Sequence, residues 1–298
     1  MIRLNQHDVT ADGSVAANSG VARNLRRRVA SAVVLAPLAL AVTYLGGWVF
    51  FVVCAIAAVA ILWEWTSLVV GRADLRILAP GSVALLAATG FAAERQATTA
   101  VAMVAIGAVL AGAVVAAGPR RRPVSDAAVW AAAGVLYAGA ALLGPVLLRS
   151  DPKLGLTALL FLFATVWATD VFAYFIGRAV GGSLLWPRLS PKKTWAGAIG
   201  GLVGGVAAGA MVAYASGGTN PAVASVLAVG LSVVAQGGDL FESAVKRRFG
   251  AKDAGNLIPG HGGVMDRLDG FLVAALVAVA IGILRQGSGA AAQGLLIW

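Results

Sequence analysis

Charged residues are scarce in this chain. Lys, Arg, Asp and Glu make up 12% of its 298 residues, whereas hydrophobic residues make up 59%. Soluble domains carry about 25% charged residues, so this composition excludes an ordinary soluble fold. The apolar stretches are continuous and reach the roughly 20 residues that a helix needs to cross a bilayer, which excludes the short alternating strands of a membrane barrel. We therefore predict an all-α, polytopic helical membrane protein.

Cysteine is nearly absent as well. The single Cys54 excludes an intrachain disulfide, and its place inside an apolar run indicates a buried, inert thiol. The formal net charge is +10, but the Lys and Arg residues lie in short gaps between apolar runs rather than along one polar helix face. This distribution is typical of membrane topology, and we expect no nucleic-acid partner.

The hydropathy pattern predicts about nine transmembrane helices. They are expected at 29–45, 48–70, 77–93, 97–117, 127–148, 154–177, 196–216, 222–238 and 270–285. Three regions follow from this pattern: a disordered cytosolic segment at 1–28, an N-terminal group of five helices at 29–148, and a C-terminal catalytic group of four helices at 149–298. Glycines in the stretch 197–209 are expected to allow close helix packing.

The distribution of basic residues predicts the orientation of the chain. With a cytosolic N-terminus and nine spans, 19 of the 23 Lys and Arg residues fall on the cytosolic side, and only Arg95, Arg149, Lys153 and Arg285 fall on the other. The C-terminus then lies opposite the N-terminus. Two polar loops, 178–195 and 239–269, are both expected on the cytosolic side.

The second of these loops has an unusual concentration of carboxylates. Five of the chain's 13 acidic residues lie between Asp239 and Asp269. Asp266 and Asp269 are three residues apart, so in a helix both would lie on one face. Their repulsion requires a counter-charge, and Mg²⁺ binds oxygen ligands of this kind together with substrate phosphates. We predict that Asp239, Asp266 and Asp269 bind one or two metal ions.

Basic residues accompany these carboxylates. Lys246, Arg247, Lys252 and Arg267 suit phosphate oxygens, although any cytosolic loop gathers such residues, so only the mixture with carboxylates is informative. The mixture indicates metal-assisted phosphoryl or nucleotidyl transfer.

Two further segments carry candidate phosphate ligands. The stretch 259–263 ends in His261, Gly262 and Gly263, whose backbone N–H groups are suited to an anion-binding turn; His261 is a phosphate ligand, an acid or base, or a residue that stabilises the turn. In the stretch 190–195, Lys192 and Lys193 are expected to reach phosphate, while Ser190 or Thr194 caps the next helix.

Two more carboxylates lie inside predicted spans. Asp170 and Glu64 are placed near the cytosolic ends of apolar helices. A carboxylate within a membrane is costly, so each is a candidate functional residue, with a neutral or ion-paired structural role as the alternative.

The residues from Ser243 to Asp269 resemble the signature of one family. Ser243, Lys246–Arg247, Lys252–Asp253, Gly255, 259–263 and 266–269 occur at the spacing of CDP-diacylglycerol synthases, the phosphatidate cytidylyltransferases. The stretches 170–178, 190–195 and 238–240 are similar to the family too, so the resemblance covers about the C-terminal half of the chain. The first five spans are similar only in hydropathy.

This resemblance implies a specific activity. It implies a homodimeric enzyme of the plasma or inner membrane that joins CTP and phosphatidate, uses Mg²⁺ and in some members a monovalent cation such as K⁺, and releases pyrophosphate. By position, Asp239 and Asp266 resemble the metal-binding pair, with Asp269 beside them. Ser243, Lys246 and the His-Gly-Gly turn resemble contacts to substrate phosphates.

The charged residues suit the chemistry that this activity requires. The lipid phosphate is already an anionic nucleophile, so its attack on the α-phosphorus of CTP needs charge neutralisation more than a protein base. We expect Asp239, Asp266 and Lys246 to be catalytic, with Lys246, Arg247 or Lys192 steadying the pyrophosphate. A cleft at the cytosolic mouth, open sideways to membrane lipids, would admit both reactants.

Other functions predict other patterns. A secondary transporter or channel would place its polar groups near the bilayer midplane, often in repeated halves, whereas this chain concentrates charge in one loop. A CTP-dependent lipid kinase or a CDP-alcohol phosphotransferase would differ in its product, and the paired-Asp spacing of the latter is absent. A non-catalytic scaffold has no need for carboxylates set against phosphate-binding cations.

Overall fold

The computed structural model describes residues 33–118, 126–217, 220–255, 257 and 262–298. Over these residues the fold is helical, and eight helices are long and apolar enough to cross a membrane. These helices are α2 Gly47–Val70, α3 Leu75–Ala93, α4 Ala97–Ala117, α5 Ala127–Arg149, α6 Gly155–Val180, α7 Trp195–Ser216, α8 Pro221–Arg248 and α9 Met265–Gln286. A short helix, α10 Ala291–Leu296, follows the 3₁₀ turn η1 Ser288–Ala290. The helical, multi-pass class predicted from composition is confirmed.

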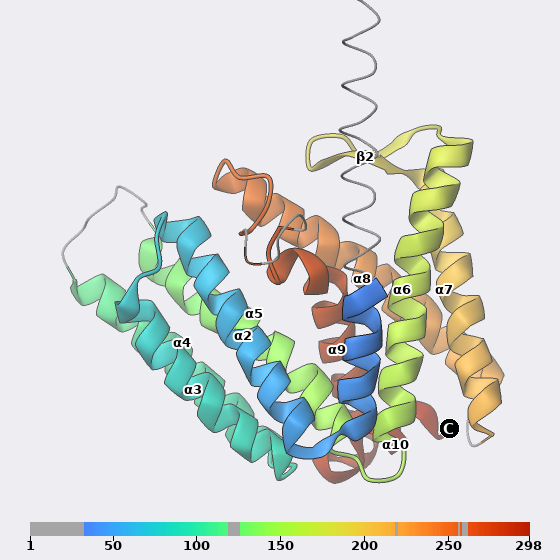
Figure 1. Ribbon diagram of the computed structural model, residues 1–298, viewed down its shortest axis with the longest axis horizontal. Helices are drawn as coiled ribbons and strands as arrows, with labels where there is room; N and C mark the ends of the chain where they lie inside the picture. The colour runs from blue at the N-terminus through green and yellow to red at the C-terminus, as the bar shows by residue number, and fades with distance from the viewer. Residues whose placement is uncertain (1–32, 119–125, 218–219, 256, 258–261) are drawn as a thin grey trace, which may run out of the picture.

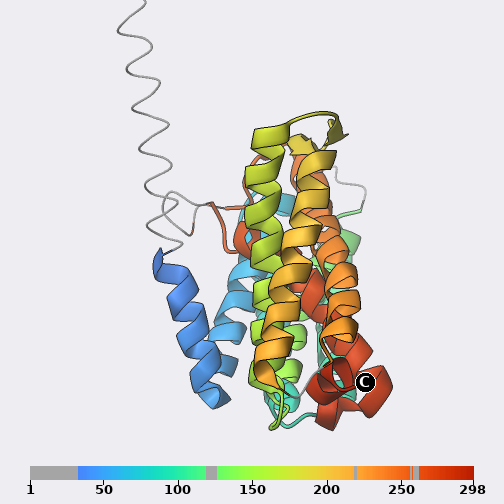
Figure 2. The same cartoon turned by 90° about the vertical axis from the view of Figure 1, so that its right-hand side faces the viewer.

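A shorter apolar helix, Val33–Leu45, occupies most of the first predicted span. It lies at the outside of the bundle (Figure 2), where Arg149 Nε donates to the carbonyl oxygen of Thr43 at 2.8 Å. Residues 29–32 and the segment 1–28, for which we predict disorder, lie outside the described residues. The count of nine spans and their orientation stay predictions.

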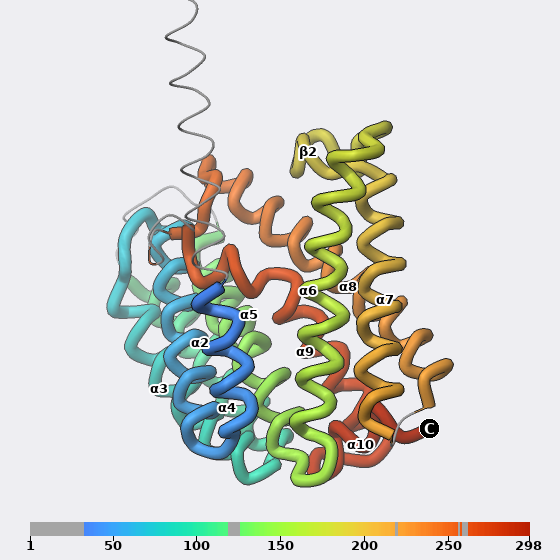
Figure 3. The backbone as a smooth tube through the Cα atoms, turned by 45° about the vertical axis from the view of Figure 1, so that its right-hand side comes forward, coloured from blue at the N-terminus to red at the C-terminus, as the bar shows by residue number. Residues whose placement is uncertain are grey.

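The helices form two groups joined by α9. Helices α2 to α5 pack on one another, while α6 packs on α7 and α7 on α8. Helix α9 contacts α5 and α2 as well as α8 and α6 (Figures 1 and 3). Residues near the start of α9 can therefore contact residues of both groups.

The polar connections gather at one end of the bundle. The α2–α3, α6–α7 and α8–α9 connections all lie at the end drawn uppermost in Figure 1. In the first of these, Asp74 caps α3 by accepting from the backbone N–H of Arg76 at 3.0 Å. Hydrogen bonds from the Arg76 guanidinium lower the pKa of the Asp74 carboxyl to about 2.

The predicted loop 178–195 is mostly ordered. Helix α6 continues to Val180, and strands β1 Leu184–Trp186 and β2 Ser190–Thr194 form an antiparallel hairpin that the all-α prediction did not include. The Thr194 hydroxyl accepts from the backbone N–H of Gly197 at 3.1 Å, so Thr194, one of two predicted candidates, caps α7.

The predicted loop 239–269 is wrong at both ends. Helix α8 continues to Arg248, and α9 begins at Met265 rather than 270. The charged residues Asp239, Glu242 and Lys246 are spaced three and four apart, so they lie on one helical face, where Lys246 pairs with Glu242, and where Asp239 and Lys246 find further partners on β2 and α9, respectively. Only the segment between Phe249 and Val264 is a connection, and part of it lies outside the described residues.

Glycines on α7 allow α6 to approach closely. A Cβ added at Gly201 would meet the backbone oxygen of Thr169 at 2.6 Å. Because a backbone carbonyl has little freedom to move, we expect Gly201→Ala to cost about 1–3 kcal/mol of stability. Thermal melting in detergent should show a lowered Tm. Gly230→Ala on α8, where nothing lies within 4 Å of the added Cβ, is the control and should melt like the wild type. Equal melting of both variants would contradict this packing.

Candidate active site

Lys246 is the centre of a buried charge network. Its ammonium donates to Glu242 Oε1 at 2.8 Å, one turn earlier on α8, and to Asp266 Oδ1 at 2.6 Å on α9. Glu242 is fully buried, and its second oxygen, Oε2, is buried and has no hydrogen-bond partner among the described residues. An ammonium has three donors, and these two contacts use two of them. Lys246 therefore retains one N–H for a further acceptor.

Asp266 is held by three donors from different segments. Besides Lys246, the backbone N–H groups of Ala254 and Gly263 donate to its Oδ2 at 2.9 and 2.8 Å. A Cβ added at Gly262, which has a φ of +81°, would meet this same oxygen at 2.8 Å. The described parts of the connection between α8 and α9 on both sides of its gap thus contact the Asp266 carboxylate. Asp266 and Asp269, which fall within the predicted loop, both lie in the first turns of α9, so the condition for a shared helical face is met.

The hairpin contributes a second lysine. Lys193 on β2 forms an ion pair with Asp239 on α8, and each side chain is 30% exposed. Asp239 lies seven residues before Lys246, about two turns away along the same face. The segments 190–194 and 239–246, which are far apart in sequence, therefore meet at the same end of the bundle. Lys192, the other predicted lysine, is exposed on the hairpin.

Carboxylates outnumber lysines in this region. The charges of Asp239 and Asp170 act on Asp269, and the charge of Asp269 acts on Glu242. The charges of Asp239 and Lys193 also act on Asp170, which is exposed on α6. Three carboxylates, on Asp239, Glu242 and Asp266, contact Lys193 or Lys246 directly. Asp170 and Asp269 are near enough for lysine charge to act on them. Such a site would repel a nucleotide triphosphate unless cations were bound.

Carboxylate oxygens are the ligands that a hard divalent cation prefers. Mg²⁺ commonly uses one or two carboxylates and completes its shell with water and substrate phosphates. Across the described residues no group of three or more His, Cys, Asp or Glu side chains is arranged to hold a metal ion. The three predicted ligands are also not equivalent, because Asp266 is already bound by Lys246 and two backbone donors. Asp239 and Asp269 are the carboxylates with more capacity left.

The remaining predicted substrate ligands are near the same connection. Ser243 is half-buried on α8, and Arg247 and Lys252 are exposed. The Arg247 guanidinium donates to the backbone oxygen of Ala251 at 3.0 Å. Arg267 is exposed on α9 and makes an interaction of its own. His261 lies outside the described residues, so its role stays a prediction.

Sequence reasoning missed one residue and left another undecided. Glu242 was not among the candidates, although its position four residues before Lys246 is the ordinary spacing of a helical ion pair. The role of Glu64 was left open between function and structure. In the fold its carboxylate accepts from the backbone N–H groups of Val264 and Met265.

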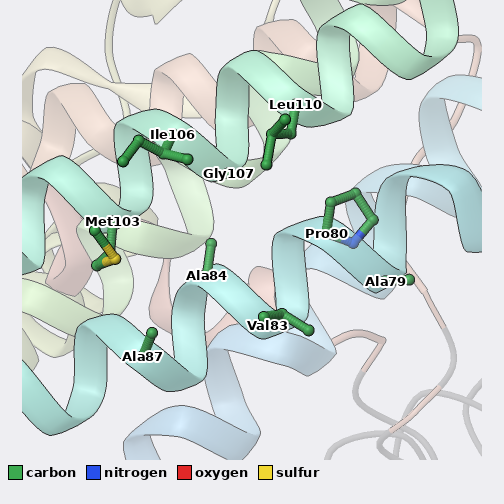
Figure 4. A pocket seen from close by; sticks show the side chains of 9 residues that line it. All are labelled: Ala79, Pro80, Val83, Ala84, Ala87, Met103, Ile106, Gly107 and Leu110. Atoms are coloured by element: carbon green, nitrogen blue, oxygen red, sulfur yellow. The ribbon is translucent and has the colours of Figure 1, made fainter.

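An apolar cavity lies elsewhere, between α3 and α4 (Figure 4). It has a volume of about 370 Å³ and is lined only by apolar residues and glycine: Ala79, Pro80, Val83, Ala84, Ala87, Met103, Ile106, Gly107 and Leu110. It has no side chain that could bind phosphate or metal. This cavity is therefore unsuited to a charged substrate.

Comparisons with known proteins show which proteins this chain resembles. A family model described as the cytidylyltransferase family matches residues 26–284. The chain is similar to the phosphatidate cytidylyltransferase of Brucella abortus biovar 1 (strain 9-941), with 42% identity over 261 residues that cover 87% of this chain and 93% of that protein. Proteins of the same name match about two-fifths of the chain: 40% identity over 126 residues in Bacillus subtilis (strain 168) and 46% over 127 residues in Mycobacterium leprae (strain TN), covering 47% and 41% of those proteins. The chain therefore belongs to the cytidylyltransferase family.

Proposed function

We propose that this protein is a phosphatidate cytidylyltransferase. In the reaction, an oxygen of the phosphatidate phosphate bonds to the α-phosphorus of CTP. The bond from that phosphorus to the β-phosphate oxygen breaks, and pyrophosphate leaves with the electron pair. The products are CDP-diacylglycerol and pyrophosphate. The relatives' names and the family support the substrates, and the charge network around Lys246 supports the site.

The contact pattern of Lys246 is the observation that carries this proposal. Its ammonium is fixed by Glu242 and Asp266, yet it keeps one donor. A fixed cation that needs no reorganisation is well suited to stabilise charge on a phosphate oxygen as it develops. Lys193, on the hairpin, would contact a phosphate further out, since it is more exposed. Lys192, Ser243, Arg247, Lys252, His261, Gly262, Gly263 and Arg267 are proposed as further phosphate contacts.

Mg²⁺ is proposed as the cofactor. Asp239 and Asp269 would bind it, with Asp266 beside them, and a monovalent cation such as K⁺ would offset part of the remaining negative charge. The metal would supply charge neutralisation of the nucleotide phosphates. The excess of carboxylates over lysines supports this proposal.

The setting of the enzyme is also a proposal. The site is expected on the cytosolic face of the plasma or inner membrane, because 19 of the 23 basic residues would then lie on that side. CTP would enter from the cytosol, and phosphatidate would enter sideways from the membrane lipids. We propose a homodimer on the family resemblance alone, and cross-linking in native membranes would test it.

The proposed activity is tested with purified protein in mixed micelles. We expect CDP-diacylglycerol and pyrophosphate to form only when CTP, phosphatidate and Mg²⁺ are all present, and Asp266→Asn to abolish both products. A folded, correctly inserted wild type that made no product under varied lipid and cation conditions would overturn the proposal, and transport assays would then be the next experiment.

A further inference from the structure

Glu64 reaches from α2 to the start of a helix two hundred residues later. It is 1% exposed, and its Oε1 and Oε2 accept from the backbone N–H groups of Val264 and Met265 at 2.9 and 2.8 Å. Helix α9 begins at Met265, and Val264, at its N-cap position, has no side-chain acceptor. The first N–H groups of a helix need acceptors and favour negative charge. Glu64, on α2, supplies both the acceptors and the negative charge.

Two glycines let the α8–α9 connection close around this carboxylate. A Cβ at Gly255 would meet Glu64 Oε1 at 2.8 Å, and one at Gly263 would meet Oε2 at 2.5 Å. Gly263 also donates its backbone N–H to Asp266. Gly255 and Gly263, at two places in the connection, are thus packed against Glu64, and Gly263 also contacts the Asp266 carboxylate.

We propose that Glu64 is a positioning residue for nucleotidyl transfer. Asp266 follows Met265 directly, so fixing the Met265 N–H also fixes where the Asp266 carboxylate meets Lys246. Glu64 acts through the backbone and touches no substrate in this scheme. The N-terminal helix group thereby controls the geometry of a site whose other residues lie in the C-terminal half. The kinetic part of this inference rests on the proposed function.

The test is Glu64→Gln, which keeps the size of the side chain. The glutamine amide has one acceptor and one donor group, so one of the two backbone N–H groups loses its partner. We expect kcat to fall by about 10- to 100-fold, which is the loss of activity typical when a residue that orients a metal ligand is mutated. KM for CTP should change by less than about threefold. Hydrogen exchange in the peptide 262–268 should become faster. Glu64→Asp, which keeps the charge on a shorter arm, should recover part of kcat.

Asp151→Asn is the matched control. Asp151 is also 1% exposed, and it accepts from the backbone N–H groups of Leu154 and Gln293, at the opposite end of the bundle. We expect it to lower the Tm about as much as Glu64→Gln while leaving kcat and exchange at 262–268 unchanged.

Two outcomes would overturn the inference. In one, Glu64→Gln loses stability as Asp151→Asn does but keeps wild-type kcat per folded molecule. In the other, exchange at 262–268 is unchanged. If Glu64→Gln does not fold, Glu64→Asp carries the same comparison. A wild type that is inactive with CTP and phosphatidate would refute the proposed function instead, and the exchange measurement would still decide whether Glu64 positions α9.

Discussion

Replacing Lys246 with methionine is expected to lower kcat/KM by about 10²- to 10³-fold, the usual cost of removing one fixed donor to a developing charge. Lys246 is the ammonium held between Glu242 and Asp266, and methionine fills similar space without a donor. The variant should also be less stable, because removing one partner of a buried ion pair costs about 3–5 kcal/mol. Steady-state kinetics in mixed micelles and thermal melting measure the two effects.

A second substitution separates these two effects. Adding Glu242→Gln to the Lys246→Met protein removes one of the two carboxylates left without their cation, so the double variant should recover stability but not activity. Arg248→Met is the matched control, since Arg248 is exposed two residues further along α8 and lies over the ring of Trp130. It should keep activity close to the wild type. Activity that returned together with stability would show that Lys246 only holds the fold.

Asp239→Asn is expected to lose activity as Lys246→Met does, but with little loss of stability. The Asp239–Lys193 pair is 30% exposed on each side, and pairs of this kind contribute at most about 1 kcal/mol. As a proposed ligand of Mg²⁺, however, Asp239 should affect kcat by 10²-fold or more and raise the Mg²⁺ concentration for half-maximal activity. Activity titrated with Mg²⁺, beside thermal melting, measures both.

The control for this variant is Asp126→Asn. Asp126 is an exposed carboxylate directly before α5 that makes no side-chain cap bond to that helix, and it is not part of the charge network. It should behave as the wild type in both assays. A Mg²⁺ dependence that was the same in Asp239→Asn and in the wild type would count against Asp239 as a metal ligand, whatever its effect on kcat.

The sequence predicted the helices well because a membrane span needs little tertiary information. Continuous apolar runs such as 97–117 match α4 residue for residue, since a helix satisfies its own backbone polar groups in lipid, whereas loops and open strands do not. The predicted end of α8 is wrong because the prediction used hydropathy alone. Its last two turns are charged, so hydropathy ended the helix at 238, whereas partners on β2 and α9 let it continue to Arg248.

The site was predictable as a set of residues but not as a geometry. The charge mixture between Asp239 and Asp269, with the family signature, identified Lys246 and Asp266, which the fold brings into contact. The pairing of Lys193 with Asp239 and of Glu64 with α9 joins positions that are distant in sequence, and no local spacing indicates such contacts. The carboxylates also differ in how many protein donors they already accept, which only a structure reveals.

The position of the transferred phosphorus tests the central claim most directly. Purified protein is incubated with phosphatidate, Mg²⁺ and CTP labelled in either the α- or the γ-phosphate, and label is counted in the lipid extract. Cytidylyl transfer predicts that α-label enters the lipid as CDP-diacylglycerol while γ-label leaves as pyrophosphate. Label that entered the lipid from the γ-phosphate would show a lipid kinase and contradict the account, as would a folded wild type that moved neither.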